Sequence, residues 1–176
     1  KREEMDKRFG IFKSGGKVLD IGAAPGSWSM YAAKRIGGRG SVLAVDLLPE
    51  HPDLPKDRYT FVQGDAFSPV IRETITSAGP FTCILSDAAP STTGNRTVDT
   101  SRSCQLVELL LDLAESELAR GGKLIAKIFQ GGDEGELLNR MKTSFQSARI
   151  YKPKASRKGS FEVFLLGTGY KGKDGG

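Results

Sequence analysis

Residues 18–28 constrain the fold of this 176-residue chain more than any other segment. An apolar run with a carboxylate near its end breaks into a turn of small residues, and a helix-like segment resumes at once. In an open α/β sheet, this pattern brings the backbone close to a nucleotide-like ligand at the carboxyl edge of the strands. The spacing differs from the dinucleotide-binding pattern G-x-G-x-x-G, because Ala24 and Ser27 stand where that pattern needs Gly.

Strand-like and helix-like patterns alternate along the rest of the chain. Apolar or β-branched runs predict strands at 17–21, 41–46, 59–63, 81–86, 123–129, 148–152 and 161–167. Helices are predicted near 27–36, 67–77, 101–119 and 134–145, the third of them ended by Gly121 and Gly122. Only a short basic loop separates the last two strands, so this pair is predicted to be antiparallel. The expected architecture is an α/β fold with about seven mostly parallel strands, one of them reversed, and helices on both faces.

The length suits one domain, which we place at residues 1–168, and the polar tail 169–176 is predicted to be disordered. The chain begins with Lys1 rather than Met, so we expect a processed chain with a segment upstream. Cys83 and Cys104 do not make a disulfide framework, which indicates a reduced, cytoplasmic setting, or an organellar matrix or nucleolus in a eukaryote. No apolar run approaches the roughly 18 residues that a membrane span needs.

Four acidic residues, Asp20, Asp46, Asp65 and Asp87, lie at or just after the ends of predicted strands. Such a set suits a ligand with ribose hydroxyls, an adenine amino group and an α-ammonium group, which indicates S-adenosylmethionine (SAM). Asp46 is predicted to accept from the ribose hydroxyls and Asp65 from the adenine amino group. Acids also cap helices and terminate strands, and Trp28 fits core packing as well as cofactor binding, so these alternatives stay open.

Lys127 and Glu162 are charged residues inside otherwise apolar strands. Burying a lone charge is costly, so a lysine and carboxylates that neutralise one another are expected to form a polar cluster with Asp87 at the crevice. A lysine that reaches solvent at a strand end and a structural ion pair are the alternatives. The long non-periodic stretch 87–101 follows a buried strand at its carboxyl end, which favours a functional loop.

Nine short segments together carry a resemblance. They are Asp-Ile-Gly-Ala-Ala-Pro-Gly-Ser-Trp at 20–28, Val-Asp-Leu-Leu-Pro at 45–49, Gln-Gly-Asp at 63–65, Ser-Asp-Ala-Ala-Pro at 86–90, Thr-Gly at 93–94, Lys-Ile-Phe-Gln-Gly at 127–131, Lys-Pro at 152–153, Ser-Arg at 156–157 and Glu-Val at 162–163. In this order, over nearly the whole chain, they resemble the FtsJ/RrmJ family of ribose 2′-O-methyltransferases. The segment 86–94 looks most like the branch that acts on large-subunit (23S) ribosomal RNA. Two departures are the missing basic stretch before Lys1 and Ala88, where that branch often has Met.

The resemblance implies a Rossmann-like SAM methyltransferase fold and a catalytic K-D-K-E tetrad of Lys1, Asp87, Lys127 and Glu162. It implies SAM as the cofactor, with no metal ion, held by Gly22, Gly26, Trp28, Asp46, Asp65 and Asp87. Methyl transfer to a ribose releases the hydroxyl proton, and we expect Lys127 to accept it or to stabilise the developing alkoxide. Neutralising a lysine at pH 7 costs roughly 4 kcal/mol, so both roles stay open.

The expected substrate is a uridine ribose of ribosomal RNA within the large ribosomal subunit. The protein is expected to act as a monomer and not to associate with a membrane. The net charge of +5 is modest. Basic residues near the predicted crevice could contact phosphates or be solvated loop charge: Lys152, Lys154, Arg157, Lys158, Arg96, Arg102, Lys7, Arg8 and Lys13. The alternatives are a tRNA anticodon-loop ribose 2′-O-methyltransferase and a non-catalytic ribosome-assembly factor. An NAD(P) oxidoreductase is disfavoured by the glycine spacing.

Overall fold

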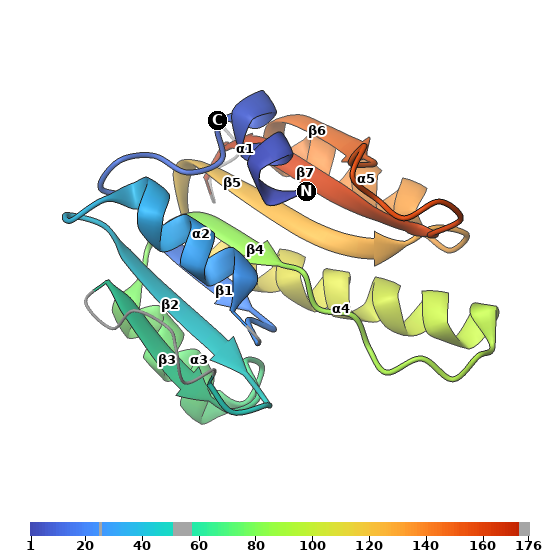
Figure 1. Ribbon diagram of the computed structural model, residues 1–176, viewed down its shortest axis with the longest axis horizontal. Coiled ribbons are helices and arrows are strands. Elements are labelled where there is room, and N and C mark those ends of the chain that lie inside the picture. The colour runs from blue at the N-terminus through green and yellow to red at the C-terminus, as the bar shows by residue number, and fades with distance from the viewer. Residues whose placement is uncertain (25, 51–57, 173–176) are drawn as a thin grey trace.

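The described part of the chain forms one sheet of seven strands in the order β3-β2-β1-β4-β5-β7-β6 (Figure 1). The computed structural model describes residues 1–24, 26–50 and 58–172. The strands are β1 (Lys17–Ile21), β2 (Ser41–Asp46), β3 (Tyr59–Gln63), β4 (Phe81–Ser86), β5 (Leu118–Phe129), β6 (Phe145–Tyr151) and β7 (Glu162–Tyr170). β7 is antiparallel to β5 and β6, whereas the other neighbouring strands are parallel. The predicted mostly parallel sheet with one reversed strand is confirmed.

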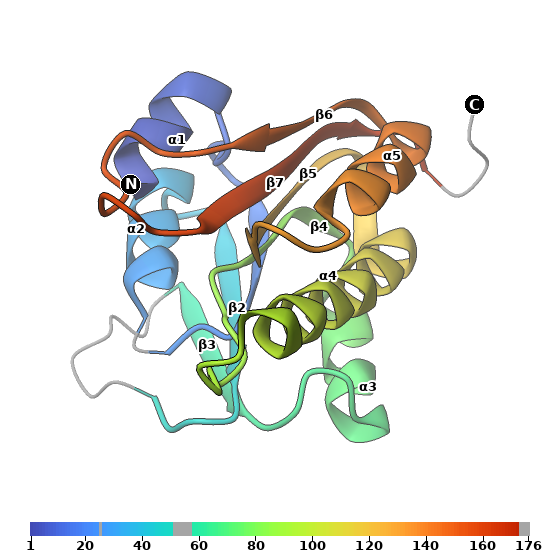
Figure 2. The ribbon, with the colours of Figure 1, turned by 90° about the vertical axis from the view of Figure 1, so that its right-hand side faces the viewer.

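Within the described residues, five helices cover the two faces of the sheet, four of which the sequence pattern predicts. They are α1 (Arg2–Phe9), α2 (Ser27–Ile36), α3 (Pro69–Ala78), α4 (Arg96–Glu117) and α5 (Glu134–Ser144). Figure 2 shows α1 and α2 on one side and α3, α4 and α5 on the other. Successive strand residues point to opposite faces, so Val18 packs in the α1–α2 core while Leu19 packs in the core under the other three helices. Burial on both faces explains why the central strands read as continuous apolar runs.

Helix α1 lies outside the elements that the sequence pattern predicts. It lacks an apolar stripe and contributes only Met5 and Asp6 to the interior. The buried Asp6 carboxylate instead accepts hydrogen bonds from Phe12 N (3.1 Å), Tyr31 Oη (2.9 Å) and Arg35 Nε (2.9 Å). A polar anchor of this kind replaces the periodic hydrophobic signal that identifies most helices.

The boundary between α4 and β5 differs from the prediction. The Asn95 side chain caps α4 by accepting from Val98 N at 3.1 Å, so the helix begins at 96 and the loop after β4 is 87–95 rather than 87–101. The prediction that Gly121 and Gly122 end this helix is wrong, because α4 ends at Glu117 and both glycines lie within β5. Residues 119–122 stand opposite the single residue Thr82 of β4, which makes this a bulged stretch of the sheet.

The tail also differs in part. Disorder was expected from residue 169, but β7 continues to Tyr170, whose ring lies 5.4 Å from that of Phe145. The Tyr170 hydroxyl donates to Glu115 O at 3.0 Å. This aromatic contact and hydrogen bond order two residues that a composition argument assigns to a free tail. Residues 173–176 lie outside the described part of the chain.

Candidate active site

A cavity of about 430 Å³ opens at the carboxyl ends of the parallel strands. The turn after β1, the end of β2 and the loops after β3 and β4 line it, and they bring Gly22, Asp46, Asp65 and Asp87 together. A cavity of this size is within the range of small-molecule sites. Four of the six residues expected to hold a cofactor therefore share one cavity.

Gly22 brings two of these turns into close contact. Its φ of +72° lies in the left-handed region, and a Cβ built on it would lie 2.3 Å from the Ala88 Cβ. Its N–H donates to Val45 O at 2.8 Å, so the backbone is held in this position. Only glycine meets both requirements, because any side chain would be strained in φ and would overlap Ala88.

Asp46 and Asp65 shape the turns that line the cavity. The Asp46 carboxylate accepts from Ala24 N and Leu48 N, both at 2.8 Å. Asp65 Oδ1 accepts from Phe67 N at 2.9 Å, within the turn that leads to α3. Both acids therefore stabilise turns, in line with the structural alternative given for them from the sequence. Both also line the cavity.

Gly26 and Trp28 lie at the start of α2. Gly26 is the N-cap residue with φ +111°, and Trp28 is 3% exposed. The indole ring lies 6.3 Å from the rings of both Phe12 and Phe164, so it packs in the core. It also lines a smaller cavity of about 100 Å³ together with Asp20 and Asp87. Core packing and a place beside the ligand crevice therefore coexist, and a cofactor contact from Trp28 stays a prediction.

Asp20 lies beneath the turn rather than in the larger cavity. It is 1% exposed and accepts a hydrogen bond from Ser29 Oγ at 2.6 Å. Burial raises the pKa of Asp20 to about 7, the Ser29 hydrogen bond opposes this, and the charges of Asp87 and Asp46 add to it. Asp20 is therefore half-ionised near neutral pH.

The raised pKa of Asp20 predicts how stability varies with pH. The unfolded chain releases this proton near the ordinary pKa of 3.8 and the folded chain only near 7, so rising pH lowers the free energy of unfolding between these values. Asp20→Asn removes this loss and should stabilise the protein by up to about 4 kcal/mol at pH 8 and hardly at all at pH 4. Urea unfolding of both proteins at several pH values measures this. An equal difference at pH 4 and 8 would contradict it, and the exposed Glu73→Gln is the control.

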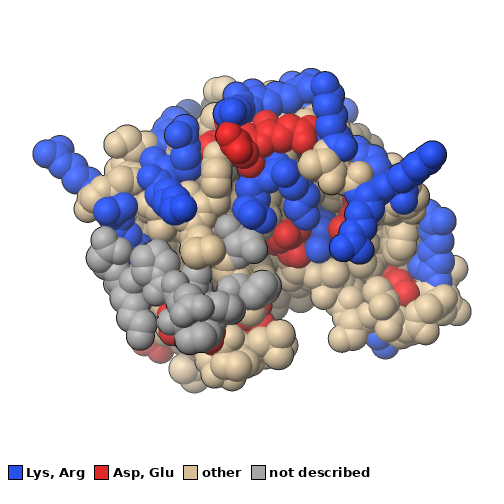
Figure 3. All heavy atoms as spheres, viewed as in Figure 1, with Lys and Arg blue, Asp and Glu red and all other residues tan. Residues whose placement is uncertain are grey.

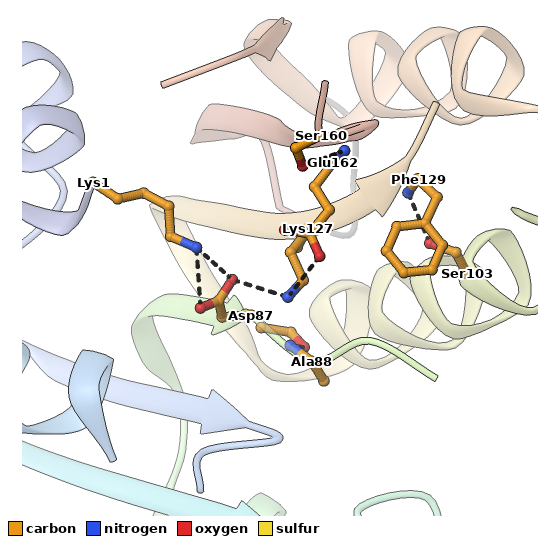
Figure 4. A network of polar contacts seen from close by, with 9 residues as sticks. Lys1, Asp87, Ala88, Ser103, Lys127, Phe129, Ser160 and Glu162 are labelled. Carbon is orange, nitrogen blue, oxygen red and sulfur yellow. Dashed lines mark hydrogen bonds and ion pairs between the residues drawn. The ribbon is translucent and has the colours of Figure 1, made fainter. Parts of the chain in front are cut away.

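The four residues of the expected tetrad meet at one point (Figure 4). Lys1 Nζ lies 3.4 Å and 3.5 Å from the two Asp87 carboxylate oxygens. Lys127 Nζ lies 3.5 Å from Asp87 Oδ1 and 3.7 Å from Glu162 Oε1. The Lys127 side chain is 11% exposed. Residues separated by 161 positions in the chain thus form one network.

The sheet explains this arrangement. Lys127 is on β5 opposite Phe164, and Glu162 begins β7 opposite Phe129, so Lys127 and Glu162 are diagonal neighbours across an antiparallel pair. Asp87 follows β4, which is the other neighbour of β5. The cluster contains two lysines and two carboxylates. Their opposite charges offset the free-energy cost of burying the Lys127 ammonium group.

A second cavity, of about 490 Å³, adjoins the tetrad. Lys1, Glu162 and Phe164 line it on one side, and Ala155, Ser156, Arg157 and Ser160 of the loop between β6 and β7 line it on the other. Asp87 lines the first cavity, so the tetrad contributes to both. Such an arrangement suits group transfer between two ligands that meet at the tetrad.

Glu4 is a site-building residue that the sequence does not reveal. Its carboxylate accepts from Tyr151 Oη at 2.6 Å, Lys154 N at 2.8 Å and Ala155 N at 3.4 Å. These bonds lower the pKa of Glu4, the Tyr151 bond most of all. Glu4 lies on α1 and therefore fixes the loop between β6 and β7, which forms part of the wall of the second cavity. Without a prediction of α1, no signal in the sequence marked it.

Among the described residues, no group of three His, Cys, Asp or Glu side chains is placed to hold a metal ion. Within the same part of the chain, no helix combines the length and the apolar character required to cross a membrane.

The sheet order, the reversed β7 and the ligand cavity at the strand ends define a Rossmann-like, SAM-dependent methyltransferase. A ribosomal RNA methyltransferase, putative, from Plasmodium falciparum has a similar structure, with a TM-score of 0.82 and 26% identity over 97% of this chain and 94% of that one. Human methyltransferase-like protein 13, solved with S-adenosylhomocysteine, shares the fold at 14% identity and a TM-score of 0.67, with 95% and 81% of the two chains covered.

The family model described as FtsJ-like methyltransferase matches residues 1–170, and the chain belongs to this family. The protein named ribosomal RNA large subunit methyltransferase E of Treponema denticola is 47% identical over 98% of this chain and 86% of its own length. The protein of the same name from Oleidesulfovibrio alaskensis is 44% identical over 98% and 84%. The resemblance drawn from the nine segments is confirmed.

Proposed function

We propose that this protein transfers the methyl group of SAM to the ribose 2′-hydroxyl of a uridine in large-subunit ribosomal RNA. The observation that carries the proposal is the tetrad of Lys1, Asp87, Lys127 and Glu162 between two cavities. The names of the two bacterial relatives support ribosomal RNA as the substrate. The wording of segment 86–94 supports the same branch of the family.

The residues of the first cavity fit the cofactor. Asp46 and Asp65 offer carboxylate oxygens to ribose hydroxyls and an adenine amino group, while Gly22 lets the backbone approach closely. Asp87 is placed to accept from the α-ammonium group, and Gly26 and Trp28 complete the proposed contacts. Bound SAM supplies an electrophilic methyl group for an in-line displacement, a reaction for which we propose no metal ion.

Lys127 acts on the hydroxyl that receives the methyl group. Its Nζ lies 3.5 Å from Asp87, which lines the first cavity, and 3.7 Å from Glu162, which lines the second. At this position Nζ accepts the hydroxyl proton or stabilises the charge that develops on oxygen. Lys1 is the second positively charged partner of Asp87. Positioning of the hydroxyl supplies much of the remaining rate.

The second cavity supports a nucleic-acid acceptor. Arg157 lines it, and the described part of the surrounding loop carries Lys152, Lys154 and Lys158 as well, which suits contacts to phosphates. We propose that the protein acts as a cytoplasmic monomer on RNA within the large ribosomal subunit. A tRNA anticodon-loop ribose is the second candidate, since a backbone-directed basic loop is compatible with either RNA.

The test is transfer of labelled methyl from SAM to large ribosomal subunits that lack their modifications, followed by nucleoside analysis. We expect label in 2′-O-methyluridine. Label in tRNA but not in subunits would overturn the substrate and keep the reaction. No transfer to either RNA would contradict the proposal and favour the assembly-factor alternative.

A further inference from the structure

Two arginines lie beside aromatic rings on the surface formed by α1 and β6. The Arg8 guanidinium is 5.5 Å from the Phe9 ring centre and 5.2 Å from that of Tyr151. The Arg149 guanidinium is 5.4 Å from the Phe9 ring. Phe9 and Tyr151 themselves meet edge to face at 5.0 Å. We call these four residues the arginine–aromatic surface.

The fold explains why the four side chains gather. Arg149 and Tyr151 are two apart on β6, so both project to the same face of the sheet, and α1 lies on that face. β6 is the last strand of the sheet, and the chain continues from it into the basic loop. Residues 149–158 contain five Lys or Arg and no acid. Figure 3 shows Lys and Arg side chains over the part of the molecule where Figure 1 places α1 and β6, with a patch of Asp and Glu side chains among them.

Neither arginine of this surface has a carboxylate partner in the described part of the chain. The acids of α1 have other direct partners: Glu3 pairs with Lys7 at 2.9 Å and Asp6 with Arg35 at 2.9 Å, while Glu4 accepts from Tyr151 of this surface and from the loop. A guanidinium held beside a ring keeps N–H groups that can donate to an oxyanion. The Arg8 guanidinium also donates to the Tyr151 hydroxyl, so only its remaining N–H groups are available. Two guanidinium groups held beside aromatic rings, without a direct carboxylate partner in the described residues, suit phosphates.

The surface continues into the reaction site. Tyr151, under Arg8, donates to Glu4, and Glu4 holds Lys154 and Ala155 of the loop that lines the acceptor cavity. A polymer with its reacting ribose in that cavity would have neighbouring backbone on this side.

We infer that the arginine–aromatic surface binds the phosphate backbone of the RNA on one side of the target nucleotide. The inference rests on the proposed function in taking RNA as the substrate. It adds a contact region outside both cavities that raises affinity without reading sequence. Arg8 and Arg149 are binding residues here and take no part in the methyl transfer.

The test is the double variant Arg8→Gln/Arg149→Gln, with Arg39→Gln as the control. Both replaced side chains are exposed, and Arg39 is an exposed arginine in the turn between α2 and β2. Binding of a large-subunit ribosomal RNA fragment is measured from 50 to 300 mM salt, together with SAM affinity and kcat at saturating RNA. We expect about tenfold weaker RNA binding and a salt slope shallower by about two, because each phosphate contact contributes about one to the slope. SAM affinity and kcat should not change.

Arg149→Lys keeps the charge but loses the stacked planar group, so we expect an intermediate loss. Binding within twofold of the wild type with the same salt slope, for the double variant, would overturn the inference while the proposed function stands. A wild-type protein that methylates no RNA and binds none would overturn both. An equal loss in Arg39→Gln would show that overall charge rather than this surface is responsible, and would also overturn the inference.

Discussion

Lys127→Ala should lower the rate of methyl transfer by about 10²–10⁴-fold, while the affinity for SAM stays within a few-fold. The side chain contacts Asp87, which lines the first cavity, and Glu162, which lines the second, so we expect it to act on the acceptor hydroxyl. It does not line the cavity proposed for the cofactor. Single-turnover methylation and calorimetric titration with SAM separate the two effects.

Removing the ammonium group leaves the Asp87 and Glu162 carboxylates without their shared partner, so the stability of the variant needs its own measurement. Lys127→Met keeps most of the side-chain volume and should be as inactive as Lys127→Ala. Lys142→Ala, on the exposed face of α5, is the matched control and should be fully active. Turnover near the wild-type rate in either Lys127 variant would refute the catalytic role.

Gly22→Ala should weaken SAM binding by about 100-fold and lower the free energy of unfolding by about 1–3 kcal/mol. The added Cβ would lie 2.3 Å from the Ala88 Cβ, at a φ of +72° that disfavours every residue with a side chain. Relief requires the turn after β1 and the loop after β4 to move apart, and both line the proposed cofactor cavity. Calorimetric titration and urea unfolding measure the two quantities.

The close contact offers a matched rescue. Ala88→Gly removes the atom at 2.3 Å but leaves Ala88 Cα at 3.3 Å and the backbone strain at position 22. The double variant Gly22→Ala/Ala88→Gly should therefore recover part of the lost affinity, and Ala88→Gly alone should bind SAM nearly as the wild type does. Wild-type affinity in Gly22→Ala would show that the close approach of the two turns is not needed for cofactor binding.

Much of the fold could be predicted because its signals are local. Each buried parallel strand is a short apolar run, and a connection too short for a helix reverses β7. Helix α1 could not be predicted in this way, since a buried carboxylate, Asp6, anchors it instead of an apolar stripe. The end of α4 also could not be predicted from the local pattern. Gly121 and Gly122 suggest a helix stop, but α4 already ends at Glu117, and the two glycines lie in the bulge of β5 between its paired residues Leu118 and Lys123.

The candidate site, like the fold, has parts that the sequence predicts and parts that it does not. Asp46 and Asp65 follow strands that share one edge of the sheet, so topology alone brings them to one cavity. The approach of Lys1 to Asp87 depends on the unpredicted α1, and only the family resemblance pointed to it. Glu4 and the arginine–aromatic surface depend on the packing of α1 against β6, which no local pattern encodes.

The polar anchoring of α1 has a consequence for how the protein loses activity. An element that contributes little apolar area to the core can open locally at a lower free-energy cost than the whole domain. When α1 detaches, Lys1 leaves Asp87 and Glu4 releases the loop at 154–155, while the seven strands stay paired. Inactivation on warming should then begin below the temperature at which the sheet melts, because the reaction centre is only as durable as an eight-residue helix.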